Sequence, residues 1–396
     1  MNLHKTPYTV GDIFRGYFDQ YLTQFGPLPK HHYAVANSIM RCRTEEMGGH
    51  IYRCDSCNEE ITLYNSCRNR HCPQCQALAR ARWVEMRMKE ALPVHYFHVV
   101  FTIPHQLNPI VLRHKKIMYT ILFKAVAETL VALGKDSRFL GGEIGFISIL
   151  HTWGQNLLDH PHIHCIVPAG ALDVKNNTWR TASKKFLFPV AVMRKIFRAK
   201  FMDYFRKAVS AGDVKPLFIA SQELPSFDSV IDLLYTQKWV VYVKKPFTTP
   251  INLIKYSARY INRIAIANQR IIEVRNDQVT FLYKDYADNN QRKIMTISAV
   301  EFIRRFMLHI IPEGFMRIRQ YGFLGNAAKK KRLPQIRQCI EKTTGTKHVV
   351  KIPEEVDNTI NSDKSPACPF CKKGKLIKNR EVAAVIKQFY KIAVND

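Results

Sequence analysis

Apolar positions along the chain recur at two spacings, and the helical one is met first. Between residues 8 and 41, aromatic and aliphatic side chains recur at helical spacing, and Pro27 with Pro29 divides the stretch into two helices. Aromatic residues at this spacing more often form a core than a base-stacking surface. The same spacing predicts further helices over 83–92, 108–133, 190–209, 228–236, 252–266 and 299–309.

Shorter runs rich in β-branched and aromatic residues predict strands. These runs lie at 60–64, 96–103, 141–151, 162–169, 239–243 and 278–284. The runs at 141–151 and 162–169 are close in sequence, so we expect them to pair antiparallel. Strands and helices do not alternate as in a parallel nucleotide-binding sheet, which favours an α+β fold on an antiparallel sheet.

The net charge of the chain indicates what kind of partner it binds. The chain of 396 residues has 60 Lys and Arg against 32 Asp and Glu, a net charge of +28. Such a field concentrates polyanions, and nucleic acid is the first candidate, although a membrane surface or a ribosome would also fit. The N-terminus has no apolar core of a signal peptide, and no uncharged apolar run approaches a membrane span of about 20 residues. We therefore expect an intracellular protein.

Ten cysteines in an intracellular protein indicate metal binding rather than disulfides. Cys54 with Cys57 and Cys72 with Cys75 form two CxxC knuckles with fourteen residues between them. This spacing is typical of a zinc ribbon, in which four thiolates hold one structural Zn²⁺. Arg68 and Arg70 lie beside the second knuckle, so we expect the module to contact DNA phosphates.

Other potential ligands surround these knuckles. Cys42, His50, Cys67 and His71 could build a second site, replace a ligand of the first, or be an ordinary buried thiol and surface donor. A third knuckle, Cys368 with Cys371, has no second half nearby. It could fold back onto Cys42 or Cys339, or hold no metal.

A histidine pair offers a different metal site. His162 and His164 alternate along an apolar strand, so both imidazoles project to the same side and make half of a divalent-metal site. A third ligand could come from His151, Gln155 or His160. We favour Gln155.

Two tyrosines lie about ninety residues further on. Tyr256 and Tyr260 are i and i+4 on the expected helix, hence neighbours on one face. Such a pair usually packs into a core. The surrounding basic residues favour a phosphate path instead: Lys244, Lys245, Arg259 and Arg263. A covalent phosphotyrosine would conserve the energy of the phosphodiester without ATP, which agrees with the absence of a GxxxxGK[ST] loop from the sequence.

Taken together, these motifs resemble the two-tyrosine HUH rolling-circle transposases of bacterial insertion sequences. The likeness runs nearly end to end, through the segments Tyr64 to Cys75, Tyr96 to Pro104, His151 to Gln155, His160 to His164, Trp239 to Tyr242, Tyr256 to Tyr260 and Tyr321 to Leu324. It implies an HUH endonuclease core, a ferredoxin/RRM-like antiparallel sheet with helices, preceded by a small helical and zinc-ribbon domain. It implies Mg²⁺ or Mn²⁺ at His162 and His164, and 5′-phosphotyrosine links from Tyr256 and Tyr260 to single-stranded DNA.

The resemblance also suggests a division of the chain. Residues 1–93 would be the zinc-binding DNA-recognition domain, 94–312 the catalytic domain, and 313–396 a basic C-terminal region. The enzyme would act in the bacterial cytoplasm, at the nucleoid. An HUH replication initiator or relaxase, and a non-catalytic zinc-dependent DNA-binding protein, are the alternative functions. The oligomeric state does not follow from the sequence.

Overall fold

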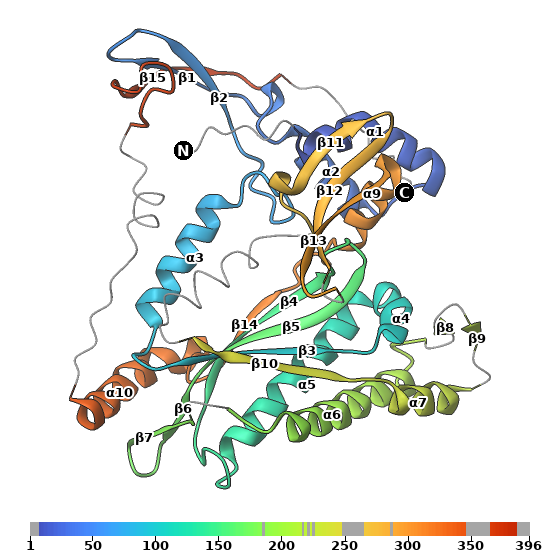
Figure 1. The fold of residues 1–396 in the computed structure, drawn as a ribbon, viewed down its shortest axis with the longest axis vertical. Helices are drawn as coiled ribbons and strands as arrows, with labels where there is room; N and C mark the ends of the chain where they lie inside the picture. The colour runs from blue at the N-terminus through green and yellow to red at the C-terminus, as the bar shows by residue number, and fades with distance from the viewer. Residues whose placement is uncertain are drawn as a thin grey trace.

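The fold is that of a computed structural model. It describes residues 8–183, 187–215, 218–219, 222–223, 226–247, 265–285, 288–345 and 365–385. A five-stranded sheet forms the centre of the molecule (Figure 1), with strand order β10-β3-β5-β4-β14. Every neighbouring pair in it is antiparallel, including β4 with β5 as expected, which confirms the α+β class. The strands are β3 (Tyr96–Thr102), β4 (Gly145–Trp153), β5 (Asp159–Pro168), β10 (Val240–Phe247) and β14 (Ile318–Gly322).

One face of this sheet holds the main core. Phe97, Phe101 and Ile163 alternate along β3 and β5 toward this face and are fully buried. They pack against helices that cover one side of the sheet in Figure 1, as when Phe101 meets Phe197 with ring centroids 5.1 Å apart. The helices are α4 (Asn108–Arg113), α5 (Lys115–Lys135), α6 (Val190–Ser210) and α7 (Phe227–Thr236). Because strand residues alternate between faces, the intervening residues point to the opposite side.

Helix α5 is long and apolar enough to cross a membrane by length and composition. Its most apolar 18-residue window is 67% buried within the fold, however, and the helix packs against α6 and the sheet. This is the environment of a core helix.

A second core joins the two N-terminal helices to a later part of the chain. Thr9 and Asp12 form a capping box that begins α1 (Val10–Phe25). Phe14 of this helix meets Phe306 of α9 (Ala299–Leu308) edge to face, with ring centroids 5.3 Å apart. The same core includes α2 (Lys30–Arg41) and a three-stranded sheet of β11 (Ile271–Arg275), β12 (Gln278–Asp285) and β13 (Gln291–Ser298).

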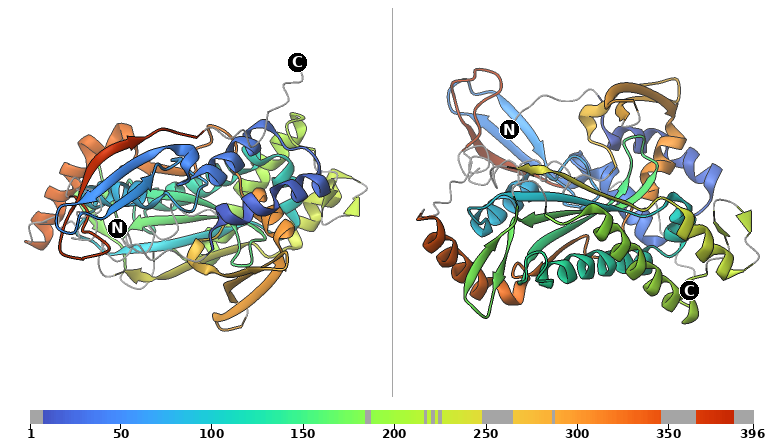
Figure 2. Two further views of the ribbon diagram at one scale, coloured as in Figure 1. Left: turned by 90° about the horizontal axis from the view of Figure 1, so that it is seen from above. Right: turned by 60° about the horizontal axis from the view of Figure 1, so that its bottom comes forward.

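The C-terminal region is not a separate unit. Its strand β14 is an edge of the central sheet, so the boundary expected at 313 does not divide the fold. Helix α10 (Asn326–Thr344) lies beside α3 (Ala77–Glu90), where Lys329 Nζ is 2.8 Å from Glu90 Oε1. The last described strand of the C-terminal region, β15 (Leu376–Val382), pairs antiparallel with β1 (Gly49–Cys54). The other neighbour of β1 is β2 (Glu60–Tyr64). Figure 2 shows β15 (red) beside this N-terminal hairpin (blue).

The remaining described elements are short. They are the hairpins β6 (Gly170–Asp173) with β7 (Thr178–Thr181) and β8 (Phe218–Ile219) with β9 (Gln222–Glu223), and the 3-10 turns η1 (Glu45–Met47), η2 (His105–Leu107) and η3 (Asn268–Arg270).

Candidate active site and metal centres

The histidines of the central strands gather on the sheet face opposite the main core. In the register of the sheet, His162 of β5 lies between His151 of β4 and Thr102 of β3. His164 is two residues further along β5, on the same face. Two strands that are joined by a short turn therefore bring three imidazoles together.

We call His151, His162 and His164 the histidine cluster. One ring nitrogen from each lies within 4.8 Å of the others. The His151 and His164 ring centroids are 4.3 Å apart, and those of His162 and His164 are 4.7 Å apart. Ligand atoms lie about 2.0–2.2 Å from a bound divalent ion, so this spacing suits three ligands of one ion. Of the two expected ions, Mn²⁺ suits nitrogen donors better than Mg²⁺, which prefers oxygen.

Burial keeps the imidazoles of His162 and His164 neutral, the form that binds metal. Desolvation lowers the pKa of His162 to about 3, and it holds the pKa of His164 well below its ordinary value. His162 Nδ1 faces the backbone carbonyl of His160, which can only accept a hydrogen bond. The proton of His162 is therefore on Nδ1, and its Nε2 lone pair is the one that can coordinate an ion.

Sequence reasoning missed one histidine of this face. His98 of β3 lies against His164, with Nε2 2.7 Å from Nδ1 of His164 and the two rings stacked at a centroid distance of 4.9 Å. Burial, together with the nearby charge of Lys244, lowers the pKa of His98 to about 4. Strand alternation in the sequence could have placed His98 on the face opposite the buried Phe97, Val99 and Phe101. Only the register between β3 and β5, however, places His98 beside His164.

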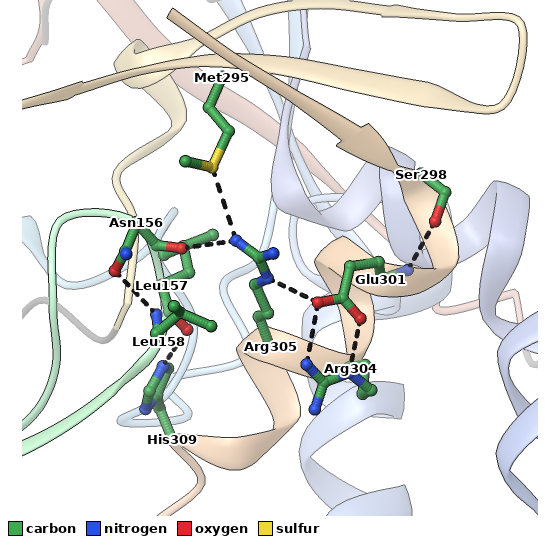
Figure 3. Close-up of polar contacts among 9 residues, drawn as sticks. All are labelled: Asn156, Leu157, Leu158, Met295, Ser298, Glu301, Arg304, Arg305 and His309. Atoms are coloured by element: carbon green, nitrogen blue, oxygen red, sulfur yellow. Dashed lines mark hydrogen bonds and ion pairs between the residues drawn. The ribbon is translucent and has the colours of Figure 1, made fainter. Parts of the chain in front are cut away.

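The turn between β4 and β5 is fixed to α9. Arg305 donates to the carbonyl of Asn156 at 3.0 Å, and His309 Nε2 donates to the carbonyl of Leu157 at 2.9 Å (Figure 3). Glu301 orients Arg305 through a 2.7 Å ion pair. These contacts hold the two histidine strands from their connecting turn.

Gln155, the third ligand expected from sequence, is in this same turn. Its carbonyl accepts a hydrogen bond from Arg270. The structure brings His151 to the other two histidines, so His151 supplies a third imidazole there. A coordinating role for the Gln155 side chain stays a prediction.

The expected nucleophiles Tyr256 and Tyr260, with Arg259 and Arg263, lie outside the described residues. The described chain resumes at Ala265, which with Ile266 belongs to the buried cluster that contains Trp153. Trp153 stacks on His151 at 4.8 Å. Before the gap, Lys244 of β10 is opposite His98 and shares its face, while the Lys245 side chain is not described.

The cysteines form two clusters, and the single ribbon expected from Cys54, Cys57, Cys72 and Cys75 is wrong. β1 and β2 form a hairpin with Cys54 and Cys57 at its turn. The chain then runs back along β2 for five residues, at about 3.3 Å each, before it reaches the second knuckle. The two knuckles therefore lie at opposite ends of the hairpin.

The first cysteine cluster consists of Cys42, Cys67, Cys72 and Cys75, whose sulfurs lie within 4.8 Å of one another. Cys67 and Cys75 Sγ are 3.7 Å apart, and the Asn69 amide donates to Cys67 Sγ. Cys42, which precedes the two expected knuckles, and Cys67, which lies between them, are thus members of a candidate metal site. The second cysteine cluster consists of Cys54, Cys57, Cys368 and Cys371.

His71 and Arg70 have internal partners near the first cysteine cluster. His71 Nε2 accepts from the Ile311 amide at 3.1 Å, and burial lowers its pKa to about 2. Arg70 donates to the carbonyls of Pro312 and Phe315 at 2.8 and 2.7 Å. These bonds attach the cysteine module to the end of α9, whereas Arg68 is exposed. DNA contacts by Arg68 and Arg70 stay predictions.

Comparison with known proteins gives consistent matches. A family model described as "Putative transposase" matches residues 145–332, which include the histidine cluster and the β4–β5 turn. A second, described as "Transposase zinc-binding domain", matches residues 13–103, which include the first cysteine cluster. No solved structure matches the chain.

Two curated relatives extend the likeness over most of the chain. "Putative transposase y4qJ" of Sinorhizobium fredii is 41% identical over 373 residues, covering 93% of this chain and 94% of that protein. "Transposase for insertion sequence element IS801" of Pseudomonas savastanoi pv. phaseolicola is 26% identical over 82% of this chain and 78% of its own length. The chain therefore belongs to the two-tyrosine transposases of bacterial insertion sequences and carries their zinc-binding domain.

Proposed function

We propose that this transposase nicks and rejoins single-stranded DNA through 5′-phosphotyrosine intermediates and so moves an insertion sequence by a rolling-circle mechanism. The observation that carries the proposal is the convergence of the His151, His162 and His164 imidazoles on one face of the central sheet, where burial keeps His162 and His164 neutral. Three such groups on two strands make a divalent-metal site, which a purely DNA-binding protein does not require.

The chemistry follows from the residues. The phenol of Tyr256 or Tyr260 loses its proton and its oxygen attacks the scissile phosphorus. The bond from phosphorus to the 3′ oxygen breaks, and the 3′ oxygen takes up a proton to leave as a hydroxyl. A Mn²⁺ or Mg²⁺ ion at the histidine cluster would withdraw charge from the scissile phosphate. The covalent link conserves the phosphodiester energy, so a 3′ hydroxyl can reverse the step on a new DNA end without ATP. Two tyrosines let one protein hold the donor and target ends in turn.

The route of the DNA is proposed from the charges on the histidine face. Lys244 shares this face, and the neighbouring Tyr242 is 55% exposed, which suits a base-stacking contact with a single strand. Lys245, Arg259 and Arg263 would continue the cationic path beside the tyrosines, and Arg68 and Arg70 would contact the element ends. We expect the enzyme to act in the cytoplasm, at the nucleoid.

A replication initiator or relaxase of the HUH type would use the same chemistry at a fixed origin. The Pseudomonas relative is a transposase for an insertion sequence element, which favours transposition for this chain as well. The non-catalytic alternative predicts that both tyrosines are dispensable.

Incubation with labelled single-stranded DNA of the element ends and Mn²⁺ tests the proposal. We expect a covalent protein–DNA adduct that is absent without metal and absent in His162→Ala. The adduct should also be lost in the double variant Tyr256→Phe/Tyr260→Phe. Folded protein that binds this DNA but forms no adduct with either Mn²⁺ or Mg²⁺ would contradict strand-transfer activity.

A further inference from the structure

The second cysteine cluster joins the β1–β2 hairpin to the segment just before the last described strand. Cys54 and Cys57 lie at the turn of the β1–β2 hairpin, whereas Cys368 and Cys371 come more than three hundred residues later, just before β15. Neither family match reaches Cys368 or Cys371, since the matches end at residues 103 and 332. We propose that these four cysteines hold a second structural Zn²⁺, which fastens the C-terminal strand to the N-terminal zinc-binding domain.

The sulfur geometry fits a tetrahedral metal site. Cys54 Sγ is 3.7 Å from Cys371 Sγ, and Cys57 Sγ is 3.7 Å from Cys368 Sγ. Four sulfurs at about 2.3 Å from a central zinc lie about 3.8 Å from one another. A disulfide would need about 2.05 Å. The arrangement therefore matches four thiolates around one ion and does not match two disulfides.

Backbone amides support the thiolates of both knuckles. The Ser56 amide donates to Cys54 Sγ at 3.4 Å, and the Gly374 amide donates to Cys371 Sγ at 3.3 Å. Each knuckle thus directs a backbone N–H at one sulfur of the proposed site.

Two hydrogen bonds between Asp55 and Lys375 also join the two knuckles. The Lys375 amide donates to Asp55 Oδ1 at 2.8 Å, and the Asp55 amide donates to the Lys375 carbonyl at 3.0 Å. A Cβ at Gly374 would come within 2.5 Å of Cys54 Sγ. This close approach leaves room only for glycine at that position of the loop after Cys371.

The apolar core of this sheet is too small to hold β15 by itself. The fully buried residues of its cluster are Cys54, Cys368 and Leu376, and two of these three are proposed ligands. The face of β15 beyond Leu376 is mostly exposed, including Ile377 at 54%. Small units with so little buried apolar surface usually depend on a metal or on disulfides for stability.

A zinc count tests the site directly and does not depend on DNA cleavage. We expect full-length protein, purified without chelator, to release two zinc ions per chain when its thiols are titrated with a mercurial. The double variant Cys368→Ser/Cys371→Ser should release one. The matched control is Cys339→Ser, a buried cysteine outside both clusters that contacts the Asn177 carbonyl, and it should still release two. Two ions from the double variant would overturn the proposal.

A cleaved chain tests whether the ion fastens the two ends together. A protease site inserted between residues 346 and 364 allows the chain to be cut after folding. With zinc bound, the C-terminal fragment should co-elute with the rest of the protein in gel filtration, and EDTA should release it. In Cys368→Ser/Cys371→Ser it should separate without EDTA. A fragment that dissociates from the zinc-loaded wild type, or that stays bound after zinc removal, would contradict the proposal.

Discussion

Nε2 of His98 lies 2.7 Å from Nδ1 of His164, and this contact determines which nitrogen of His164 can bind a metal. If His98 donated, the proton of His164 would sit on Nε2 and block coordination there. If His164 donates from Nδ1 and His98 accepts, the Nε2 lone pair of His164 can coordinate an ion. A metal-binding histidine cluster therefore needs His98 as an acceptor, which makes His98 a positioning residue.

This relationship predicts a graded effect of substitution at His98. His98→Leu should weaken Mn²⁺ binding by about 10- to 100-fold, the usual effect of losing a partner of a metal ligand. His98→Gln should restore part of the affinity, because its amide oxygen can accept from His164. Mn²⁺ titration followed by electron paramagnetic resonance measures both. Equal affinity in His98→Leu and wild type would exclude the positioning role.

The third metal ligand can be assigned by a matched pair of variants. His151 belongs to the histidine cluster, whereas Gln155 lies in the following turn. We expect His151→Ala to abolish detectable Mn²⁺ binding at micromolar ion concentrations and Gln155→Ala to weaken it less. The reverse order would make Gln155 the principal third ligand, as the sequence alone suggested.

The contact between Arg305 and the β4–β5 turn should matter for activity as well as stability. Arg304 and Arg305 both pair with Glu301, but Arg305 also donates to the Asn156 carbonyl. Arg305→Ala should cost about 1–3 kcal/mol of unfolding free energy, because a charged hydrogen bond is lost and a carbonyl loses its donor. Strand-cleavage rate should fall as well.

Arg304→Ala is the control, since it removes a Glu301 partner and leaves the turn contact in place. Its stability loss should stay below that of Arg305→Ala, and its cleavage rate should stay near wild type. Chemical denaturation and single-turnover cleavage measure the two effects. If both variants behaved alike, the turn contact would have no special role.

Acid should destabilise the fold through buried histidines outside the metal centres. Burial lowers the pKa of His309 to about 4, below its ordinary value of 6.5. As pH falls from 6.5, the unfolded chain gains this proton and the folded chain does not, so stability is lost progressively down to about pH 4. Stability attributable to this group is retained above pH 6.5.

His309→Gln should therefore reduce the loss of unfolding free energy between pH 6.5 and 5 by about 1–2 kcal/mol. Urea denaturation at both pH values measures the difference, with exposed His105→Gln as the control. An identical pH dependence in His309→Gln and wild type would show that this histidine does not contribute.

The central strands and helices could be read from the sequence because each has a strong local pattern. Strand β5 alternates histidines with buried Ile163 and Cys165, and α6 buries Phe197, Phe201 and Phe205 at helical spacing. Local patterns do not reveal distant partners. Strand β14 is a short edge of five half-buried residues, and β15 is polar along most of its length, so neither carries a clear strand signal.

The candidate metal sites show the same limit. The pair of His162 and His164 follows from strand alternation alone, but His98 and His151 join them through sheet register, which no local pattern specifies. The cysteine spacing identified metal ligands but paired the wrong knuckles. The β1–β2 hairpin separates Cys54 from Cys72, and Cys54 clusters instead with Cys368, which is more than three hundred residues away in the sequence.

The most direct test of the account is to identify the covalent linkage. The protein is incubated with Mn²⁺ and single-stranded DNA of the element end, digested with nuclease and protease, and analysed by peptide mass spectrometry. We expect a nucleotide joined through its 5′ phosphate to Tyr256 or Tyr260, and no such peptide from His162→Ala. A linkage to another residue, or none from metal-loaded protein that binds the DNA, would contradict two-tyrosine strand transfer at the histidine cluster.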